Sequence, residues 1–275
     1  MTTHSATIVT CYFKIKSKHT NDNYKTWMKN MLVNIETPMI IYTDEESYDY
    51  IENTRLNSSE KHGPHNTQII KMRMEDFYTY KYKDIWDKQW NLDPENSYHT
   101  PELYMIWAEK TNFLRKSIES NPFDSEFFLW CDIGCFRRRP FTSDITNMSV
   151  LKNWPNKDKI ATLPKDKILL TQIERFTGNN EKYKELRKDS SGLTVHKFPH
   201  TLVFVGGTMF GGYKDTLLKW WDVYYEMLEN YFKFFRFAGK DQDIMANILI
   251  VRPDICYPVF AEWGDPWFYF HHYLK

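Results

Sequence analysis

The chain has 275 residues, of which 42% are hydrophobic and 17% aromatic, and this is enough apolar material for one large α/β domain or two small ones. The 36 basic and 36 acidic residues balance, so the chain carries no overall field that would attract nucleic acid or an anionic membrane. Its first residues lack a basic segment followed by a long apolar one, and no window reaches the apolar length of a membrane span, so we expect a soluble, cytoplasmic protein without an integral membrane segment.

The four cysteines are too few and too scattered for a disulfide framework. Three of them lie in or beside apolar, strand-like runs, which predicts reduced and mostly buried thiols in an intracellular protein. Cys131 and Cys135 have a spacing that also occurs in zinc sites, but no second pair accompanies them. We therefore do not expect a structural zinc ion.

The first part of the chain predicts three strands. Residues 6–13 form an uninterrupted β-favouring run, and residues 39–42 and 68–72 form two more. Between the first two, residues 23–34 have the apolar spacing of a short amphipathic helix. The second strand ends next to Asp44, which begins an acidic run that suits a helix N-terminus. Asp44 is therefore either a first-turn helix charge or a ligand-binding carboxylate.

Residues 74–98 are dense in tyrosine and tryptophan without a clean period, which predicts an irregular excursion across the surface. A hydroxyl, a proline and an acid at residues 100–102 then mark a helix start, and the helix is expected to run to about residue 120. Lys110 falls in the middle of the apolar stripe of this helix. It either reaches the surface, pairs with a buried acid or contacts a phosphate in a cleft.

Residues 127–140 carry the most informative pattern of the chain. Residues 127–131 form a short, aromatic apolar run that fits a strand buried on both faces of a parallel sheet. Asp132 follows where such a strand ends, and ligands of open α/β sheets bind outside the carboxyl ends of the strands. Asp132 is therefore a candidate ligand for a metal ion or a sugar, although an aspartate at this place also caps turns.

The region that follows is less regular. We expect a polar helix at residues 142–153 and a short strand at residues 160–163. Residues 168–192 are charged and contain glycine and serine, so they are a candidate mobile flap. His196 and His200 lie on either side of a Phe-Pro pair that breaks a helix, and we interpret both as structural residues.

The last part of the chain predicts a buried strand at residues 202–205, which leads into the glycine-flanked run 206–212. Such positions either let a sugar ring lie close to the backbone or form a tight turn without a ligand. Residues 215–236 keep the apolar spacing of a long helix. Residues 241–243 read Asp-Gln-Asp, and the first of them has the type of a helix cap. Residues 263–275 are strongly aromatic, so we expect the terminus to pack on the domain.

These motifs, in this order, resemble a glycosyltransferase of the GT-A fold. The segments are IVTCYF, MIIYTD, FLWCDIG, VGGTMFGG and DQDIMAN. YMIWAEKTNFLR and NPFDSEFFLWCDIGCFR are similar to the HtrL/YibB-like family, and the likeness spans nearly the full chain. The resemblance implies an α/β, Rossmann-like fold with a mixed, mainly parallel central sheet flanked by helices. Because nothing marks a boundary, we expect a single domain over residues 1–275.

The resemblance implies an enzyme that moves a sugar from a nucleotide-sugar donor, in first place a UDP-sugar, to a hydroxyl group of a glycan, lipid-linked or protein acceptor. GT-A enzymes use a D-x-D motif to bind a divalent ion that bridges the diphosphate of the donor. Asp132 matches its first aspartate, and Gly134 stands at the second position. Since one carboxylate does not hold a divalent ion, the analogy implies His271 or His272 as a further ligand, and an imidazole favours Mn²⁺ over Mg²⁺.

The implied chemistry assigns the remaining roles. Cleavage of the bond to the diphosphate leaves negative charge on the leaving oxygens, which Lys110 and Arg137 are expected to stabilise. An oxocarbenium-like centre and an acceptor hydroxyl need a carboxylate nearby. The predicted catalytic residues are Asp241, Gln242 and Asp243, and the predicted donor-binding residues are Thr10, Cys11, Tyr12, Asp44, Lys110, Arg137, Gly206 and Gly207.

Two other functions stay open at this point. A nucleotidyltransferase on a similar sheet usually has a glycine-rich phosphate loop after its first strand, and CYFKIKSKHT contains no glycine. A carbohydrate-binding protein without catalysis would explain the many aromatic residues, but it gives no role to a carboxylate at a strand end.

Overall fold

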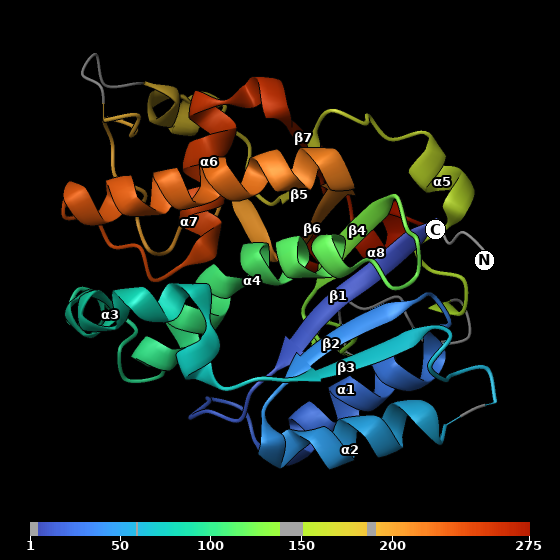
Figure 1. Ribbon diagram of the computed structural model, residues 1–275. Helices are drawn as coiled ribbons and strands as arrows, with labels where there is room; N and C mark the ends of the chain where they lie inside the picture. Colours follow the sequence, from blue (N-terminus) through green and yellow to red (C-terminus); the bar gives the residue numbers. More distant parts are fainter. Residues whose placement is uncertain (1–4, 59, 138–150, 186–190) are drawn as a thin grey trace.

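In the computed structural model, which describes residues 5–58, 60–137, 151–185 and 191–275, the chain forms a seven-stranded sheet with helices on both faces (Figure 1). The strands are β1 (Ala6–Tyr12), β2 (Met39–Thr43), β3 (Thr67–Lys71), β4 (Phe127–Cys131), β5 (Ile168–Gln172), β6 (Val205–Tyr213) and β7 (Cys256–Phe260). The α-helices are α1 (Asn21–Asn34), α2 (Glu45–Leu56), α3 (Lys83–Trp90), α4 (Pro101–Ser120), α5 (Lys157–Ala161), α6 (Lys214–Lys233), α7 (Asp241–Val251) and α8 (Phe270–Tyr273). Short 3-10 helices are Met74–Asp76, Tyr78–Tyr82, Gly178–Lys184, Pro253–Ile255 and Pro266–Phe268.

The strand order of the sheet is β3-β2-β1-β4-β6-β5-β7. The four strands from β3 to β4 run parallel to one another, and β5 runs parallel to β7. β6 is antiparallel to both of its neighbours, β4 and β5. The predicted α/β class with a mixed, mainly parallel sheet is therefore confirmed.

The two faces of the sheet belong to two apolar cores, because alternate side chains of a strand point to opposite sides. On β4, Phe128 and Trp130 join the core that contains residues of α4, α6 and α7, whereas Phe127 and Leu129 join the core that contains residues of α1 and α2. Figure 1 shows α1 and α2 lying together beside β1 to β3, and α4, α6 and α7 lying together above them. All five residues of β4 are buried, as expected for a strand covered on both faces.

Most elements of the first half of the chain lie where the sequence predicts them. β1 to β4 begin and end within two residues of the predicted runs, and α4 begins at the predicted proline. The Thr100 hydroxyl accepts a hydrogen bond of 3.4 Å from the backbone N–H of Leu103, so it caps α4 as expected. The aromatic segment 74–98 was expected to be irregular throughout, but it contains two 3-10 turns and α3, in which Trp86 is fully buried.

Three predictions for the second half of the chain are wrong. Residues 160–163 lie at the end of α5 and just beyond it, where Ile160 and Leu163 bury their side chains at helical spacing. The first five residues of the candidate flap, 168–172, form β5, whose first four residues are buried, so the prediction is wrong for this part of the segment. The predicted strand 202–205 begins only at Val205, and the glycine-flanked run continues it as β6.

The glycines of β6 have a packing reason. A Cβ atom on Gly211 would collide with the carbonyl oxygen of Phe128 and lie 3.0 Å from Cα of Leu129. Glycine therefore lets the backbones of β6 and β4 approach closely within the sheet, and it does not form a turn here. Most of the helix predicted at residues 142–153 lies outside the described residues.

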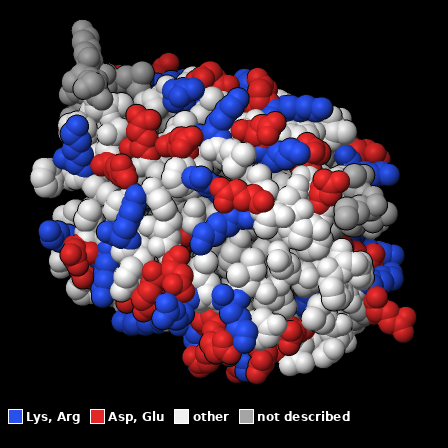
Figure 2. Space-filling view, viewed as in Figure 1, with Lys and Arg blue, Asp and Glu red and all other residues white. Residues whose placement is uncertain are grey.

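All four cysteines are buried and free, as expected. Among the described residues, none of the helices combines the length and the apolarity that a bilayer crossing requires. On the face of the molecule drawn in Figure 2, basic and acidic side chains are interspersed and do not gather by sign. This agrees with the balanced charge of the chain and leaves charge recognition to local groups.

Candidate functional site

A pocket of about 540 Å³ opens at the carboxyl ends of β1 and β4. The two strands are parallel neighbours, so the residues at their ends meet at one edge of the sheet. Other parts of the wall come from the middle of α4, from β6, from the first turn of α7 and from the loop before α4. The wall includes Cys11, Lys110, Asp132, Gly207, Asp241 and His99.

Lys110 lies between two carboxylates in this pocket. Its Nζ is 3.0 Å from Asp132 Oδ1 and 2.9 Å from Asp241 Oδ2, and it donates a hydrogen bond of 2.8 Å to the carbonyl oxygen of Gly207. The side chains of Lys110 and Asp241 are only 4% and 6% exposed, whereas that of Asp132 is 30% exposed. We call Lys110, Asp132 and Asp241 the Asp-Lys-Asp cluster.

The cluster keeps its lysine charged. Burial alone would lower the pKa of Lys110, but the adjacent carboxylates of Asp132 and Asp241 outweigh burial and raise it above its ordinary value. Burial raises the pKa of Asp241, and the ion pair with Lys110 counteracts this rise. Of the alternatives that the sequence leaves open for Lys110, the structure shows pairing with a buried acid.

Asp132 is held by its neighbours at the end of β4. The indole Nε1 of Trp130 donates a hydrogen bond of 2.8 Å to Asp132 Oδ1, and the backbone N–H of Asp132 donates one of 2.9 Å to the carbonyl oxygen of Thr208 on β6. Its own carbonyl oxygen accepts from the N–H of Cys135, which closes the turn after the strand. The carboxylate therefore has a fixed direction and still reaches the pocket.

Asp241 rests directly against Gly207. A Cβ atom on Gly207 would lie 2.5 Å from Asp241 Oδ1, so only glycine leaves room for this carboxylate. The same Oδ1 accepts a hydrogen bond of 2.8 Å from the N–H of Gln242. Asp241 is the first residue of α7, where the N-terminal helix dipole favours a negative charge.

Of the predicted nucleotide-binding residues of the first two strands, some line the pocket and others have only a structural role. Cys11 and Tyr12 line the pocket, and burial raises the pKa of Tyr12 to about 12. Thr10 is fully buried in β1 and is not part of the pocket wall. Asp44 is also outside the wall. It caps α2, because its carboxylate accepts hydrogen bonds of 2.5 Å from the N–H of Lys14 and 2.7 Å from the N–H of Ser47.

The other predicted donor-binding and catalytic residues divide in the same way. Arg137 lines the pocket, donates a hydrogen bond of 2.6 Å to the carbonyl oxygen of Gly134, and lies 4.0 Å above the ring of Trp27. Gly207 and Gln242 line the pocket. Two further candidates, Gly206 and Asp243, are not part of its wall.

The two C-terminal histidines lie away from the described pocket wall. His271 is 4% exposed, and its ring stacks on Phe136 with the centroids 4.2 Å apart. Burial lowers its pKa well below the ordinary value. His272 contacts the ring of Trp263 at 4.3 Å. The described structure therefore brings neither imidazole to Asp132 on the pocket surface.

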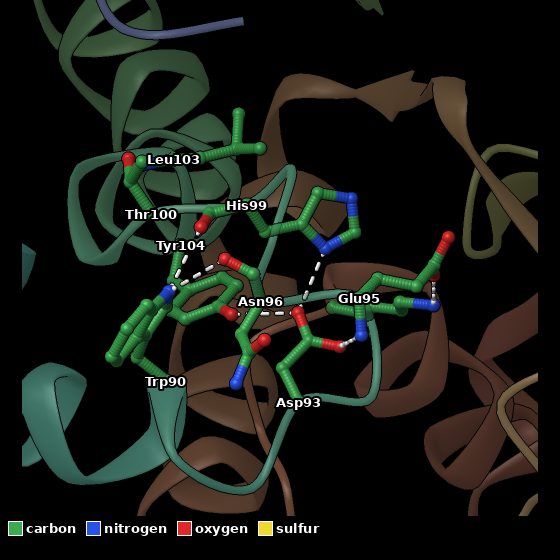
Figure 3. Close-up of polar contacts among 9 residues, drawn as sticks. Trp90, Asp93, Glu95, Asn96, His99, Thr100, Leu103 and Tyr104 are labelled. Atoms are coloured by element: carbon green, nitrogen blue, oxygen red, sulfur yellow. Dashed lines mark hydrogen bonds and ion pairs between the residues drawn. The ribbon is translucent and has the colours of Figure 1, made fainter. Parts of the chain in front are cut away.

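A second polar group in the pocket region was missed in the sequence. Asp93, Glu95 and His99, from the loop before α4, each offer a ligand atom within 4.8 Å of the others, a spacing that could hold a metal ion. Figure 3 shows the ring of His99 with one nitrogen toward Asp93 and the other turned away from it. The only sequence signal is a D-x-E-x-x-x-H spacing in a loop, which carries little information without the fold.

The hydrogen bonds of this group are satisfied within the protein. Asp93 Oδ2 lies 2.7 Å from His99 Nδ1 and 2.6 Å from the hydroxyl of Tyr104. Lys240 Nζ lies 2.5 Å from Glu95 Oε2, so an ammonium group already neutralises that carboxylate. Although burial opposes ionisation of Asp93, the hydrogen bonds from Tyr104 and its neighbours lower its pKa.

The Asp-Lys-Asp cluster does not fit the divalent ion that the resemblance implies. Mg²⁺ binds carboxylate oxygens at about 2.0–2.1 Å and Ca²⁺ at about 2.3–2.6 Å, so an ion bridging Asp132 and Asp241 would need the space that Lys110 Nζ occupies. Gly134, at the second motif position, has no side chain to offer. We therefore assign no step of a reaction to a metal ion at this cluster.

Comparison with known proteins gives a family but no established activity. A family model described as "Bacterial protein of unknown function (HtrL_YibB)" matches residues 4–189. A search of curated proteins finds no match for this chain.

Two solved structures are similar in outline. Mouse xyloside xylosyltransferase 1, in its apo form, has a TM-score of 0.49 and 11% identity, with 98% of this chain and 90% of that chain covered. The 4-diphosphocytidyl-2C-methyl-D-erythritol synthase of Anaerococcus prevotii has a TM-score of 0.36 and 15% identity, with 94% of this chain and 88% of that chain covered. At these values neither likeness assigns an activity to this chain.

Proposed function

We propose that the chain, which belongs to the HtrL_YibB family, is a glycosyltransferase that moves a sugar from a nucleotide-sugar donor, in first place a UDP-sugar, to a hydroxyl group of a glycan, lipid-linked or protein acceptor. The observation that carries this proposal is the convergence of Lys110, Asp132 and Asp241 on one pocket at the carboxyl end of β4. The volume of about 540 Å³ lies within the usual range of small-molecule sites.

The end of β1 supports the nucleotide part of this proposal. Tyr12 and Tyr24 line the pocket with their ring centroids 5.5 Å apart, and an aromatic face of this kind stacks on a planar base. Cys11 lies beside them as an apolar wall, because burial raises the pKa of its thiol and keeps it neutral. Thr10 and Asp44 act through the fold in this proposal, since they belong to the sheet and to the cap of α2.

Basic side chains support the placement of the diphosphate. Lys16 and Lys18, from the segment after β1, and Arg137, after β4, line the same pocket. Negative charge grows on the leaving oxygens as the bond between the anomeric carbon and the diphosphate breaks. In this proposal these three side chains stabilise that charge, while Lys110 is already neutralised by two aspartates.

The sugar lies near α7 in this proposal. Gln242 lines the pocket next to Asp241 and is available to orient the hydroxyl groups of the sugar. The carboxylate of Asp241 faces the positive charge that develops at the anomeric carbon. Lys110 fixes the direction of this carboxylate. Mn²⁺, the cation that the resemblance favours, has no role here because the ammonium group of Lys110 takes its place between the aspartates.

Hydrolysis of a panel of UDP- and GDP-sugars tests this function. We expect one donor to be hydrolysed, and we expect Asp241→Asn and Asp132→Asn to lower that rate by about 10²-fold, because each removes a charge next to the reacting centre. Asp215→Asn is the matched control, since Asp215 is exposed at the start of α6. Circular dichroism should show all three variants folded. Full activity in folded Asp241→Asn would contradict the proposal.

A further inference from the structure

The Nζ atom of Lys110 has three protein oxygen atoms within 3.0 Å. These atoms are Asp132 Oδ1, Asp241 Oδ2 and the carbonyl oxygen of Gly207, at 3.0, 2.9 and 2.8 Å from Nζ. The contact with Gly207 is a hydrogen bond and the contacts with the two aspartates are ion pairs, so the ammonium group has three oxygen partners inside the protein. The oxygens come from the end of β4, the start of α7 and β6, and Lys110 therefore joins three elements at one point.

A divalent metal ion at this point would need the same carboxylate oxygens. An ion bound to both Asp132 Oδ1 and Asp241 Oδ2 would compete with Lys110 Nζ, which already contacts both oxygens at 3.0 and 2.9 Å. The side chain of Lys110 is 4% exposed, so displacing it would leave a buried ammonium group without partners. The metal ion and the lysine therefore exclude each other.

The charge of Lys110 does not depend on the supply of metal ions. The two aspartates raise its pKa although burial opposes this, so the lysine keeps its proton at neutral pH. Glycine at position 134 agrees with this arrangement, because a second carboxylate in the turn is not required to balance a single ammonium charge.

We propose that Lys110 is the cation of this site in place of a divalent metal ion, and that Asp132 and Asp241 bind Mn²⁺ only when the lysine is removed. The meaning of this inference for catalysis rests on the proposed function. Lys110 is then a positioning residue, which holds the Asp241 carboxylate toward the sugar, and the proposed transfer needs no divalent ion at this cluster.

Binding of Mn²⁺ alone, followed by the electron paramagnetic resonance signal of the free ion, tests this inference without any nucleotide. Lys110→Met keeps an unbranched side chain, one heavy atom shorter, and removes the ammonium group with its charge. We expect this variant to bind about one Mn²⁺ per chain, and we expect Asp132→Asn added to it to abolish that binding. Lys214→Met removes a partly exposed lysine paired with Glu126, outside the pocket wall, and is the matched control, which should behave as the unchanged protein.

If Lys110→Met does not fold, Mn²⁺ binding by the unchanged protein and by Asp132→Asn still tests the inference. Mn²⁺ bound by the unchanged protein and released by Asp132→Asn would overturn it. Equal Mn²⁺ binding by these two proteins, including none, supports it, because Asp132 is then not a ligand while Lys110 is present. Failure of every nucleotide sugar to bind or react would contradict the proposed function alone, since the Mn²⁺ experiment uses no nucleotide.

Discussion

Asp243 lies in the first turn of α7, one residue beyond the pocket wall, and its environment favours the protonated carboxyl group. Burial raises its pKa from the ordinary 3.8 to about 7, although the charge of Lys240 acts in the opposite direction. The folded protein therefore binds a proton at this residue more tightly than the unfolded chain does. Its contribution to stability is fully present below pH 3.8 and is lost as the pH rises through about 7.

Replacement of Asp243 by asparagine should remove the loss of stability that occurs as the pH rises through about 7. At pH 8 we expect Asp243→Asn to raise the free energy of unfolding by roughly 1–3 kcal/mol, because no partly buried charge remains. Near pH 4 the difference from the unchanged protein should be close to zero. Urea unfolding at a series of pH values measures both. A difference that is constant across this range would show that Asp243 titrates normally.

Individual residues show where sequence patterns stop being informative. Helical spacing is enough to place Lys110 in an apolar stripe, and this predicts correctly that an interior lysine needs a partner. The partners themselves, Asp132 and Asp241, come from other elements and meet it only in the folded chain. His271 carries an imidazole near the terminus, but the stacking of Phe136 on its ring depends on tertiary packing that no local pattern records.

At the scale of elements, the contact between β6 and the start of α7 sets the position of the Asp241 carboxylate. We expect Gly207→Ala to lower the free energy of unfolding by roughly 1–3 kcal/mol, because the new methyl group overlaps this carboxylate. We also expect donor hydrolysis to fall by about tenfold or more, since Asp241 must leave its place beside Lys110.

The neighbouring glycine provides the control for this change. A Cβ atom on Gly206 would lie 3.2 Å from Cδ1 of Ile173, at the flexible end of a side chain. Gly206→Ala should therefore cost less than about 1 kcal/mol and leave donor hydrolysis near its original rate. Urea unfolding and the hydrolysis assay measure both variants. Equal effects of the two substitutions would contradict a specific role for the β6–α7 contact.

Elements with a strong local signal could be predicted from the sequence, and β5 and β7 could not. β1, β2 and β4 are apolar, β-favouring runs that end beside polar residues, so their position and their buried state follow from the pattern. β5 and β7 each have five residues, and β7 exposes two consecutive residues, one of which is a proline. β5 pairs with β6 on one side and with β7 on the other. These are contacts between distant parts of the sequence, which local patterns do not predict.

At the scale of the whole molecule, the balanced charge leaves recognition to the pocket. Basic and acidic side chains are interspersed on the face drawn in Figure 2, and Lys16, Lys18 and Arg137 are among the residues of the pocket wall. The α/β class and the family could be recognised from the sequence because several different motifs follow one another in a characteristic order. The single domain over residues 1–275 and the roles of the site residues stay predictions.

Calorimetric titration of the full chain with UDP, with free monosaccharides as the comparison, tests the central claim most directly. We expect saturable binding of UDP at one site, with a dissociation constant in the range of roughly 1 μM to 1 mM, because the pocket joins aromatic rings to basic side chains. We expect no comparable heat from the sugars alone. Binding of free sugar without binding of UDP would contradict the central claim.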